Sequence, residues 1–329
     1  MCMAVTLKTK EGHHFFGRNL DVVTNYGQEV ITIPRNFTYK NVAENREETS
    51  KYACIGMGIV VNNHPLMFDG VNEKGLAAAG LNFTYFAKFN EEAIPNKTNL
   101  SASDFIYWVL GNFSNLDDLK VALKDVVLTN IPVAEGFAVS KLHWMFTDLS
   151  GKSIVVEYID EQMRVHDNPV GVLTNDPNFE WHLTNLSQYV VVSNKTAEPR
   201  QMVDMLVKPY GHGLNLVGLP GDDSPASRFV RTTFFKENII SNEGKDAGIN
   251  DFFKVLDSVF VTKGSQRDDN GAMNYTLYQS GMCQEECIYY YRDYDNSRIN
   301  AVNLFKEDLD GKEIKKFSYK NTLDILFQN

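Results

Sequence analysis

Cysteine is scarce in this chain of 329 residues, which has only four, at positions 2, 54, 283 and 287. So few cysteines fit reduced thiols better than a disulfide framework, which small secreted domains build from many cysteines. Cys283 and Cys287 form a lone C-x3-C without partner histidines, so this pair does not indicate a metal site. We expect no metal and a reducing compartment.

Long hydrophobic runs are also missing from the chain. No segment approaches the roughly 20 apolar residues that a membrane-spanning helix needs. A secretory signal would place an apolar stretch close to the start, whereas Lys8, Lys10 and Glu11 interrupt that region here. The sequence therefore predicts a cytoplasmic protein with no membrane partner.

Basic residues are outnumbered, because 32 Lys and Arg face 42 Asp and Glu and give a net charge of −10. A field of this sign repels nucleic acid and anionic lipid, so neither is an expected partner. The glycine-rich segment 211–218 lacks the G-x-G-x-x-G spacing of dinucleotide-binding loops, and neither H-E-x-x-H nor G-x-S-x-G occurs. The function must therefore rest on residues outside these common motifs.

No repeat, low-complexity tract or linker divides the chain, which predicts a single domain over residues 1–329. Strands are expected at 4–7, 14–19, 28–34, 54–61, 65–69, 142–147, 153–158, 163–166, 170–173, 274–279, 287–292 and 298–304. Helices are expected at 104–112 with Ser103 as N-cap, after Asn115, and at 180–186, 199–207, 227–236 and 250–261. Runs of strands that alternate with runs of helices favour a layered α+β sandwich.

The chain opens with MCMAVTL, which places a cysteine directly after the initiator methionine. If an aminopeptidase removes Met1, Cys2 carries a thiol and a free α-amine, so it is a nucleophile with its own base. The alternative is that Cys2 is a small buried hydrophobe in an apolar strand. The opening residues alone favour this alternative.

The stretch FFGRNLD, residues 15–21, contains two candidate charged groups. Arg18 and Asp21 differ by three positions, so in an uninterrupted strand their side chains point to opposite faces. Both reach one site only if the strand ends or bulges near Asn19 and Leu20, and Gly17 would permit a close approach of the backbone beside them. Taken alone, the two residues fit an ordinary ion pair at a strand end.

Three further stretches place polar residues where the chain turns. Asn82 follows a run of small residues in AGLNFTYF, Asn175 lies in GVLTNDPNF before Pro177, and Arg228 lies near the start of a helix in GLPGDDSPASRF. Each stretch alone is explained by turn chemistry, because Asn, Asp, Gly and Pro dominate turns for backbone reasons.

Seven ordered motifs together make the chain resemble the choloylglycine hydrolase family, which contains the bile salt hydrolases and the penicillin V acylases. They are MC at the start, FGRNLD, NEKGLAAAGLNF, SIVVE, GVLTNDPNF, GLPGDDSPASRF and IYYYRDYDN. The resemblance runs from Cys2 to about Leu304 and keeps the order of every motif. One departure is Met3, where many members have threonine.

The resemblance implies an N-terminal nucleophile hydrolase with two stacked antiparallel sheets between helical layers, a four-layer αββα sandwich, commonly assembled as a homotetramer. The mature chain would begin at Cys2 and span residues 2–329. The catalytic residues that carry over by position are Cys2, Arg18, Asp21, Asn82, Asn175 and Arg228. No metal or organic cofactor is implied.

Physical chemistry gives each of these residues a role. A thiol with a pKa of about 8.5 is mostly protonated at neutral pH, and the α-amine at about 7.7 to 8.0 is able to accept its proton. Arg18 would favour the thiolate by charge, and Asp21 would orient the amine. Asn175 through its amide, and Asn82 through backbone or side chain, would stabilise the oxyanion. Arg228 would stabilise the charges near Cys2 or bind the anionic end of a substrate.

The hypothesis for the substrate is a bile acid joined by an amide to glycine or taurine. Asn82 is the residue type that resembles bile salt hydrolases, whereas penicillin V acylases often carry tyrosine there. A steroid also needs an apolar wall, for which the candidates are Leu20, Met57, Ile59, Phe68, Ile131 and Phe137. Each of these six fits a core or loop position equally well.

Two alternatives remain at this stage. One is an acylase that acts on penicillin V or another N-acyl compound. The other is a non-catalytic binder of amphipathic acids, which becomes serious if Met1 is retained and the α-amine of Cys2 is never freed.

Overall fold

The computed structural model describes residues 1–268 and 270–329. Its first large sheet is antiparallel and has the strand order β14-β1-β2-β18-β19-β20, with β17 paired to β18. The strands span Val172–Leu173 (β14), Cys2–Lys8 (β1), His14–Val22 (β2), Gln266–Arg267 (β17), Met273–Cys283 (β18), Ile288–Asp293 (β19) and Asn300–Asn303 (β20). Cys2 is therefore the first residue of a strand inside this sheet.

The second large sheet is also antiparallel, in the order β13-β12-β11-β8-β7-β6-β3-β21. Its strands span Gln162–Asp167 (β13), Ser153–Ile159 (β12), Leu142–Thr147 (β11), Ala77–Asn82 (β8), His64–Asn72 (β7), Cys54–Val61 (β6), Glu29–Ile33 (β3) and Lys315–Phe317 (β21). Smaller pairs form from Thr38–Asn41 (β4) with Arg46–Thr49 (β5), and from Thr98–Ser101 (β9) with Val126–Thr129 (β10).

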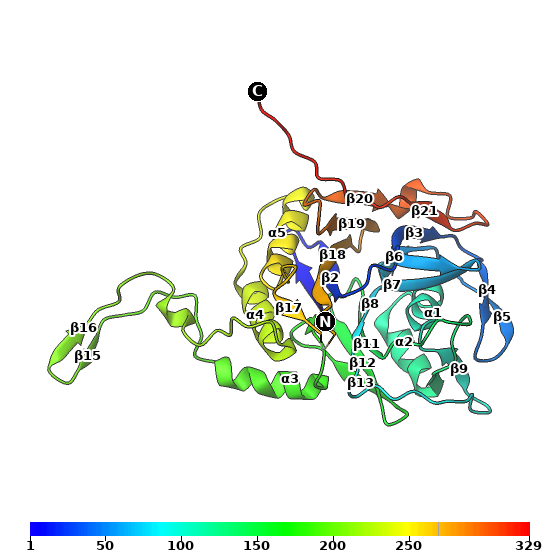
Figure 1. Cartoon of the computed structure of the whole chain (residues 1–329), viewed down its shortest axis with the longest axis horizontal. Coiled ribbons are helices and arrows are strands. Elements are labelled where there is room, and N and C mark those ends of the chain that lie inside the picture. Colours follow the sequence, from blue (N-terminus) through cyan, green and yellow to red (C-terminus); the bar gives the residue numbers. More distant parts are fainter. Residues whose placement is uncertain (269) are drawn as a thin grey trace.

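Helices cover the outer faces of the two sheets (Figure 1). Helices α4 (Pro225–Asn238) and α5 (Lys245–Asp257) pack on the first sheet, whereas α1 (Phe105–Asn112) packs on β7 and β8 of the second. Helices α2 (Leu116–Ala122) and α3 (Phe179–Asn185) are shorter, and single 3-10 turns lie at Leu123–Asp125, Leu186–Tyr189, Leu214–Leu216 and Leu304–Lys306. The expected α+β sandwich of two sheets between helical layers is confirmed.

Two hydrophobic cores follow from these layers. One contains Cys2, Leu20 and Met57 together with Phe252 of α5, so it includes the space between the sheets and the underside of α5. The other joins α1 to the outer face of the second sheet. Small residues in β8 permit this close packing, because a Cβ on Gly80 would lie 3.2 Å from Ile106 of α1.

Most expected elements are present, and the bounds of β6 and β11 agree with the sequence pattern. The expected helix at 199–207 is wrong, since this segment forms the hairpin of β15 (Arg200–Met202) and β16 (Met205–Val207). The hairpin lies on an arm, residues 190–219, that extends away from the body of the molecule (Figure 1). A short helix is marginal without tertiary packing, and the arm offers little surface against which a helix could pack.

The sequence suggested Ser103 as the N-cap of α1, and this prediction is wrong. The N-cap is Asp104, whose side chain makes no capping bond. Its carboxylate lies instead 2.5 Å from the ring of His64, a buried tertiary contact that replaces the local one. No helix in the described part of the chain is long and apolar enough to cross a membrane.

Candidate active site around Cys2

Cys2 begins β1 with its main chain held on both sides. Its backbone nitrogen donates to Asn175 Oδ1 at 2.7 Å, and its carbonyl oxygen accepts from Arg228 Nη1 at 2.6 Å. The residue is 3 % exposed and lies in the hydrophobic core, as expected if Cys2 were only a small buried hydrophobe. Burial alone does not explain why two polar side chains from distant segments converge on its backbone.

Met1 is held as an additional strand residue in front of Cys2. Its ammonium donates to the carbonyl oxygen of Asp21 at 2.6 Å, and the amide of Asp21 donates back to the carbonyl oxygen of Met1 at 2.9 Å. The free ammonium of this chain therefore belongs to Met1 and is engaged with backbone.

Arg18 and Asp21 lie on opposite faces of β2, as the spacing of three predicted. Arg18 reaches into the space between the sheets, where Nη1 donates to the carbonyl oxygens of Phe68 at 3.3 Å and Gly80 at 2.5 Å. Asp21 faces the helical layer, where its carboxylate accepts from Thr276 Oγ1 at 2.7 Å.

The expected irregularity near Leu20 is present, but on the partner strand. The register of β18 shifts between Thr276 and Tyr278, opposite Asp21 and Leu20. Gly17 is required nearby, because a Cβ at this position would clash with the carbonyl oxygen of Ser280 in β18. Cys2 is the first residue of β1 and pairs with Leu20 of β2. Because β1 ends there, groups from both faces of β2 come near Cys2.

The guanidinium of Arg18 is buried yet incompletely bonded. Among the described residues, its Nη2 atom has no hydrogen-bond partner. Burial alone would lower the pKa of Arg18, but the acidic groups around it, Cys2 and Asp69 among them, together raise it. The pKa of Asp69 is itself raised by burial, and this carboxylate accepts from Tyr278 at 2.6 Å and Tyr289 at 2.5 Å. Arg18 therefore keeps its positive charge, and one nitrogen is free to bind.

Arg228, near the start of α4, is bonded on all three nitrogens. Besides the carbonyl of Cys2 it donates from Nη2 to Asn175 Oδ1 at 2.8 Å and from Nε to the carbonyl oxygen of Asp223 at 3.0 Å. Asp21 Oδ2 lies 3.9 Å from Nη1. Burial lowers the pKa of Arg228 and raises that of Asp21, so burial outweighs the attraction of the pair at this separation.

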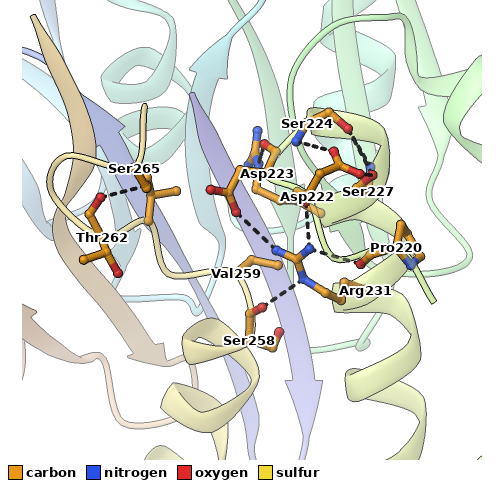
Figure 2. A network of polar contacts seen from close by, with 12 residues as sticks. Pro220, Asp222, Asp223, Ser224, Ser227, Arg231, Ser258, Val259, Thr262 and Ser265 are labelled. Atoms are coloured by element: carbon orange, nitrogen blue, oxygen red, sulfur yellow. Dashed lines mark hydrogen bonds and ion pairs between the residues drawn. The ribbon is translucent and has the colours of Figure 1, made fainter. Parts of the chain in front are cut away.

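The loop before α4 is held by a second arginine, Arg231 (Figure 2). Its guanidinium donates to the carbonyl oxygens of Ser258, Pro220 and Asp222 at 3.0, 3.1 and 2.7 Å. Ser224 caps the helix by accepting from the amide of Ser227. Hydrogen bonds from Ser224 and Ser227 lower the pKa of Asp222 to about 2. The carbonyl of Asp223, to which Arg228 binds, is part of this fixed loop.

The two asparagines meet on the other side of Cys2. Asn175 follows β14, and its Nδ2 donates to the backbone oxygen of Asn82 at 2.7 Å. The side chain of Asn82 is exposed, and its Oδ1 accepts from Thr84. One hydrogen of the Asn175 amide group is therefore used, and the second is available to another acceptor.

Sequence reasoning missed two histidines behind Asn175. His143 of β11 contacts the carbonyl oxygen of Thr174 at 2.8 Å, and His182 of α3 contacts the carbonyl oxygen of Asn175 at 2.8 Å. Both rings are fully buried. The only sequence signal is a histidine at an inward position of an apolar strand or helix, and that pattern more often marks an ordinary core residue.

The residues of the predicted apolar wall fall into three groups. Leu20 lies opposite Cys2, and the backbone of Phe68 binds Arg18, so both border the site. Met57 is fully buried in the same core as Cys2. Ile59 is half-buried in β6, while Ile131 and Phe137 lie in the loop between β10 and β11, where Phe137 is 41 % exposed.

Two of the other three cysteines, Cys54 and Cys287, differ from Cys2 in their surroundings. None of the four is in a disulfide. Burial raises the pKa of the Cys54 thiol, which contacts Met67, and raises that of Cys287 to about 12. Cys2 differs in that its charge acts on the pKa of both Arg18 and Arg228.

Comparison with known proteins gives one family. The family model described as linear amide C–N hydrolases, choloylglycine hydrolase family, matches residues 2–317. A bile salt hydrolase/transferase from Clostridium perfringens is 44% identical over 325 residues, which is 99% of both chains.

Solved structures agree with this match. The crystal structure of the C2A mutant of the conjugated bile acid hydrolase from Clostridium perfringens superposes with a TM-score of 0.95 at 43% identity over 100% of both chains. A penicillin V acylase from Agrobacterium tumefaciens shares the fold, with a TM-score of 0.76 at 22% identity over 96% of this chain and 90% of its own.

Proposed function

Because the chain belongs to the linear amide C–N hydrolases of the choloylglycine hydrolase family, we propose that it cleaves the amide that joins a bile acid to glycine or taurine, with Cys2 as nucleophile. The observation that carries this proposal is the anchoring of Cys2: Asn175 binds its nitrogen and Arg228 binds its carbonyl oxygen. A residue held in this way keeps its position after the methionine in front of it is removed.

Removal of Met1 supplies the base in this mechanism and leaves a mature chain of residues 2–329. The nitrogen of Cys2 then becomes an α-amine that accepts the thiol proton, and Arg18 favours the thiolate by charge. Its unpartnered Nη2 supports this role, because that nitrogen has no other acceptor to satisfy. Asp21, 3.9 Å from Arg228 on the other face of β2, adds negative charge that favours the protonated amine.

The thiolate attacks the amide carbonyl, a C–S bond forms, and the carbonyl oxygen becomes an oxyanion. The free hydrogen of Asn175 Nδ2 is the proposed donor to that oxygen, and Asn82 fixes this group through its backbone oxygen. The ammonium protonates the leaving nitrogen as the C–N bond breaks. Water activated by the amine then hydrolyses the thioester and releases the bile acid.

Exposed aromatic side chains next to the site support an apolar acyl group. Tyr85 and Phe86 follow Asn82 closely, and they are 87% and 38% exposed. Tyr26 is 51% exposed and packs edge-on against Phe68 at 5.6 Å between ring centroids. The pKa of Tyr26 is raised by burial and by the charge of Cys2, which supports its place beside the thiol. These residues add to the wall expected from Leu20 and Phe68.

The test combines the N-terminus with the chemistry. Intact mass and N-terminal sequencing of purified protein are expected to show loss of Met1, and glycine and taurine are expected to be released from conjugated bile salts. A processed protein that releases neither, but cleaves penicillin V, would replace the bile-salt proposal with the acylase. Retained Met1 without turnover would replace both enzymes with a binder of amphipathic acids.

We also propose that the enzyme forms a homotetramer in the cytoplasm. The four cysteines outside disulfides fit a reducing compartment. The arm carries exposed apolar side chains, among them Val203 and Tyr210, each 92% exposed, and such residues are typical of contact surfaces. Val203→Asp with Tyr210→Asp is expected to lower the mass measured by light scattering. Val121→Asp, a matched change at a 66% exposed valine of α2, is expected to leave that mass unchanged.

A further inference from the structure

The dipeptide Thr174-Asn175 lies between two buried histidines. A carbonyl oxygen only accepts, so the Nε2 atoms of His143 and His182 must both carry the hydrogen that binds Thr174 and Asn175 at 2.8 Å. The loop that presents the Asn175 amide is thus bonded at two successive carbonyls. Both histidines are fully buried, so water does not compete for these bonds.

Each histidine also stacks on a phenyl ring next to a different site residue. His143 stacks on Phe83, which follows Asn82, with ring centroids 4.2 Å apart and planes 7° apart. His182 stacks on Phe229, which follows Arg228, at 4.8 Å and 22°. Stacking fixes both the position and the orientation of a ring. The three groups of the proposed site that come from separate segments are therefore connected through two imidazoles.

Glu157 of β12 connects this pair to the start of α3. Its Oε1 atom accepts from the amide of Phe179, the first residue of α3, at 2.8 Å and lies 3.3 Å from His143 Nδ1. The carboxylate is fully buried. One side chain thus holds the helix that carries His182 and lies against the ring of His143.

We propose that His143 and His182 are positioning residues, which set the distance between the Asn175 amide and its partners Asn82 and Arg228 without contacting substrate. This inference rests on the proposed function, in which the Asn175 amide stabilises the oxyanion. A displacement on the order of 1 Å in such a group reduces turnover by up to about 100-fold. The effect belongs to kcat, because an oxyanion forms only after substrate has bound.

The experiment separates the hydrogen bond from the ring. His143→Phe and His182→Phe keep an aromatic ring for stacking and lose the donor. His143→Gln and His182→Gln keep a side-chain N–H and lose the ring. We expect kcat of each Phe variant to fall on the order of 10- to 100-fold with KM changed by less than about threefold, and each Gln variant to recover most of that loss.

The control is His64→Phe. His64 is also buried and bonded, to Asp104 at 2.5 Å, but it joins β7 to the segment before α1. This variant is expected to lower the melting temperature while kcat stays within about twofold of wild type. A loss of kcat equal to that of the two Phe variants would mean that any buried histidine affects activity through stability alone.

The rate at which iodoacetamide alkylates Cys2, measured on the N-terminal peptide, reports on the thiol in a reaction that forms no oxyanion. This rate is expected to be the same in wild type and in all four variants. The proposal is overturned if folded Phe variants keep wild-type kcat, or if kcat and alkylation fall together. If wild type does not cleave bile salts, the same comparison is made on the amide that it does cleave. The positioning is then still tested by the alkylation rate and by crystal structures of His182→Gln and His182→Phe, in which the distance from Cys2 N to Asn175 Oδ1 is measured.

Discussion

The two arginines beside Cys2 are equally buried but are held in different ways. Arg228 donates from three nitrogens and joins Cys2, Asn175 and the loop before α4. Within the described part of the chain, Arg18 donates only to backbone oxygens, of Asn19, Phe68 and Gly80, and its Nη2 has no partner.

The electrostatic balance of the two arginines differs as well. Burial outweighs attraction at Arg228 and lowers its pKa, whereas anionic neighbours outweigh burial at Arg18 and raise its pKa. We infer that Arg228 mainly holds the geometry of the site, while Arg18 mainly supplies charge to it. The predictions below test this division.

The largest effect is expected from Cys2→Ala, which removes the group that both arginines serve. Turnover is expected to fall by at least about 10⁴-fold, because loss of a catalytic nucleophile has effects of this size. The main-chain bonds to Asn175 and Arg228 do not involve the thiol, so the melting temperature is expected to change little. Wild-type turnover in this variant would mean that neither arginine acts through Cys2.

The next effect distinguishes the arginines directly. Arg228→Leu leaves Asp21 buried without its cation and is expected to lower the free energy of unfolding by about 3 to 5 kcal/mol. Arg18→Leu also takes a cation away from buried Asp69, but that carboxylate keeps the hydroxyls of Tyr278 and Tyr289. A smaller loss of stability is therefore expected, together with slower alkylation of Cys2 at neutral pH. Denaturant melts and iodoacetamide kinetics of both variants measure this, and equal loss of stability would remove the distinction.

His182, on the Arg228 side, is expected to make stability depend on pH. Burial lowers the pKa of His182 to about 4 from its usual 6.5, and its ring stacks on Phe229 next to Arg228. A depressed histidine pKa means that the unfolded chain binds the proton more tightly, so stability is lost as pH falls from about 6.5 to 4, by up to about 3 kcal/mol.

His182→Gln, which cannot take up this proton, is expected to flatten the dependence when melting temperature is measured between pH 4 and 7. His64→Gln provides the matched change elsewhere. An unchanged slope in His182→Gln would show that the acid sensitivity has another source.

The smallest effect is expected from Ser224→Ala at the N-cap of α4. Loss of a serine cap usually costs about 1 kcal/mol, here on the helix that carries Arg228. Alkylation of Cys2 depends on charge from the opposite side and is expected to remain at the wild-type rate. A change in that rate would couple the two sides more closely than their separate bonds suggest.

Local patterns predicted much of the fold, because β-branched runs bounded by turns specify strands such as β6 and β11. The segment 199–207 was mispredicted because its helical composition is not supported by packing on the arm. The six proposed catalytic residues were selected through ordered motifs and not through spacing. Their spacing alone left Arg18 and Asp21 on opposite faces, which is how the strand presents them.

Residues that act only through tertiary contacts could not be found in this way. His143 lies 31 positions before Thr174, and no pattern near it indicates that contact. Asp69 is another example, since the hydroxyls of Tyr278 and Tyr289 reach it from strands more than 200 positions away. Sequence reasoning recovers groups that form motifs, and it misses those that form a site only after the sheets have stacked.

The pairing of Met1 with Asp21 has a consequence for the order of events during synthesis. Once β1 has joined β2, the terminal ammonium is engaged with a backbone carbonyl, and an aminopeptidase must pull a strand end out of a sheet to reach it. We therefore expect the methionine to be trimmed while the nascent chain is still extended from the ribosome. The fraction of mature enzyme would then depend on whether Met1 is removed faster than β1 pairs with β2.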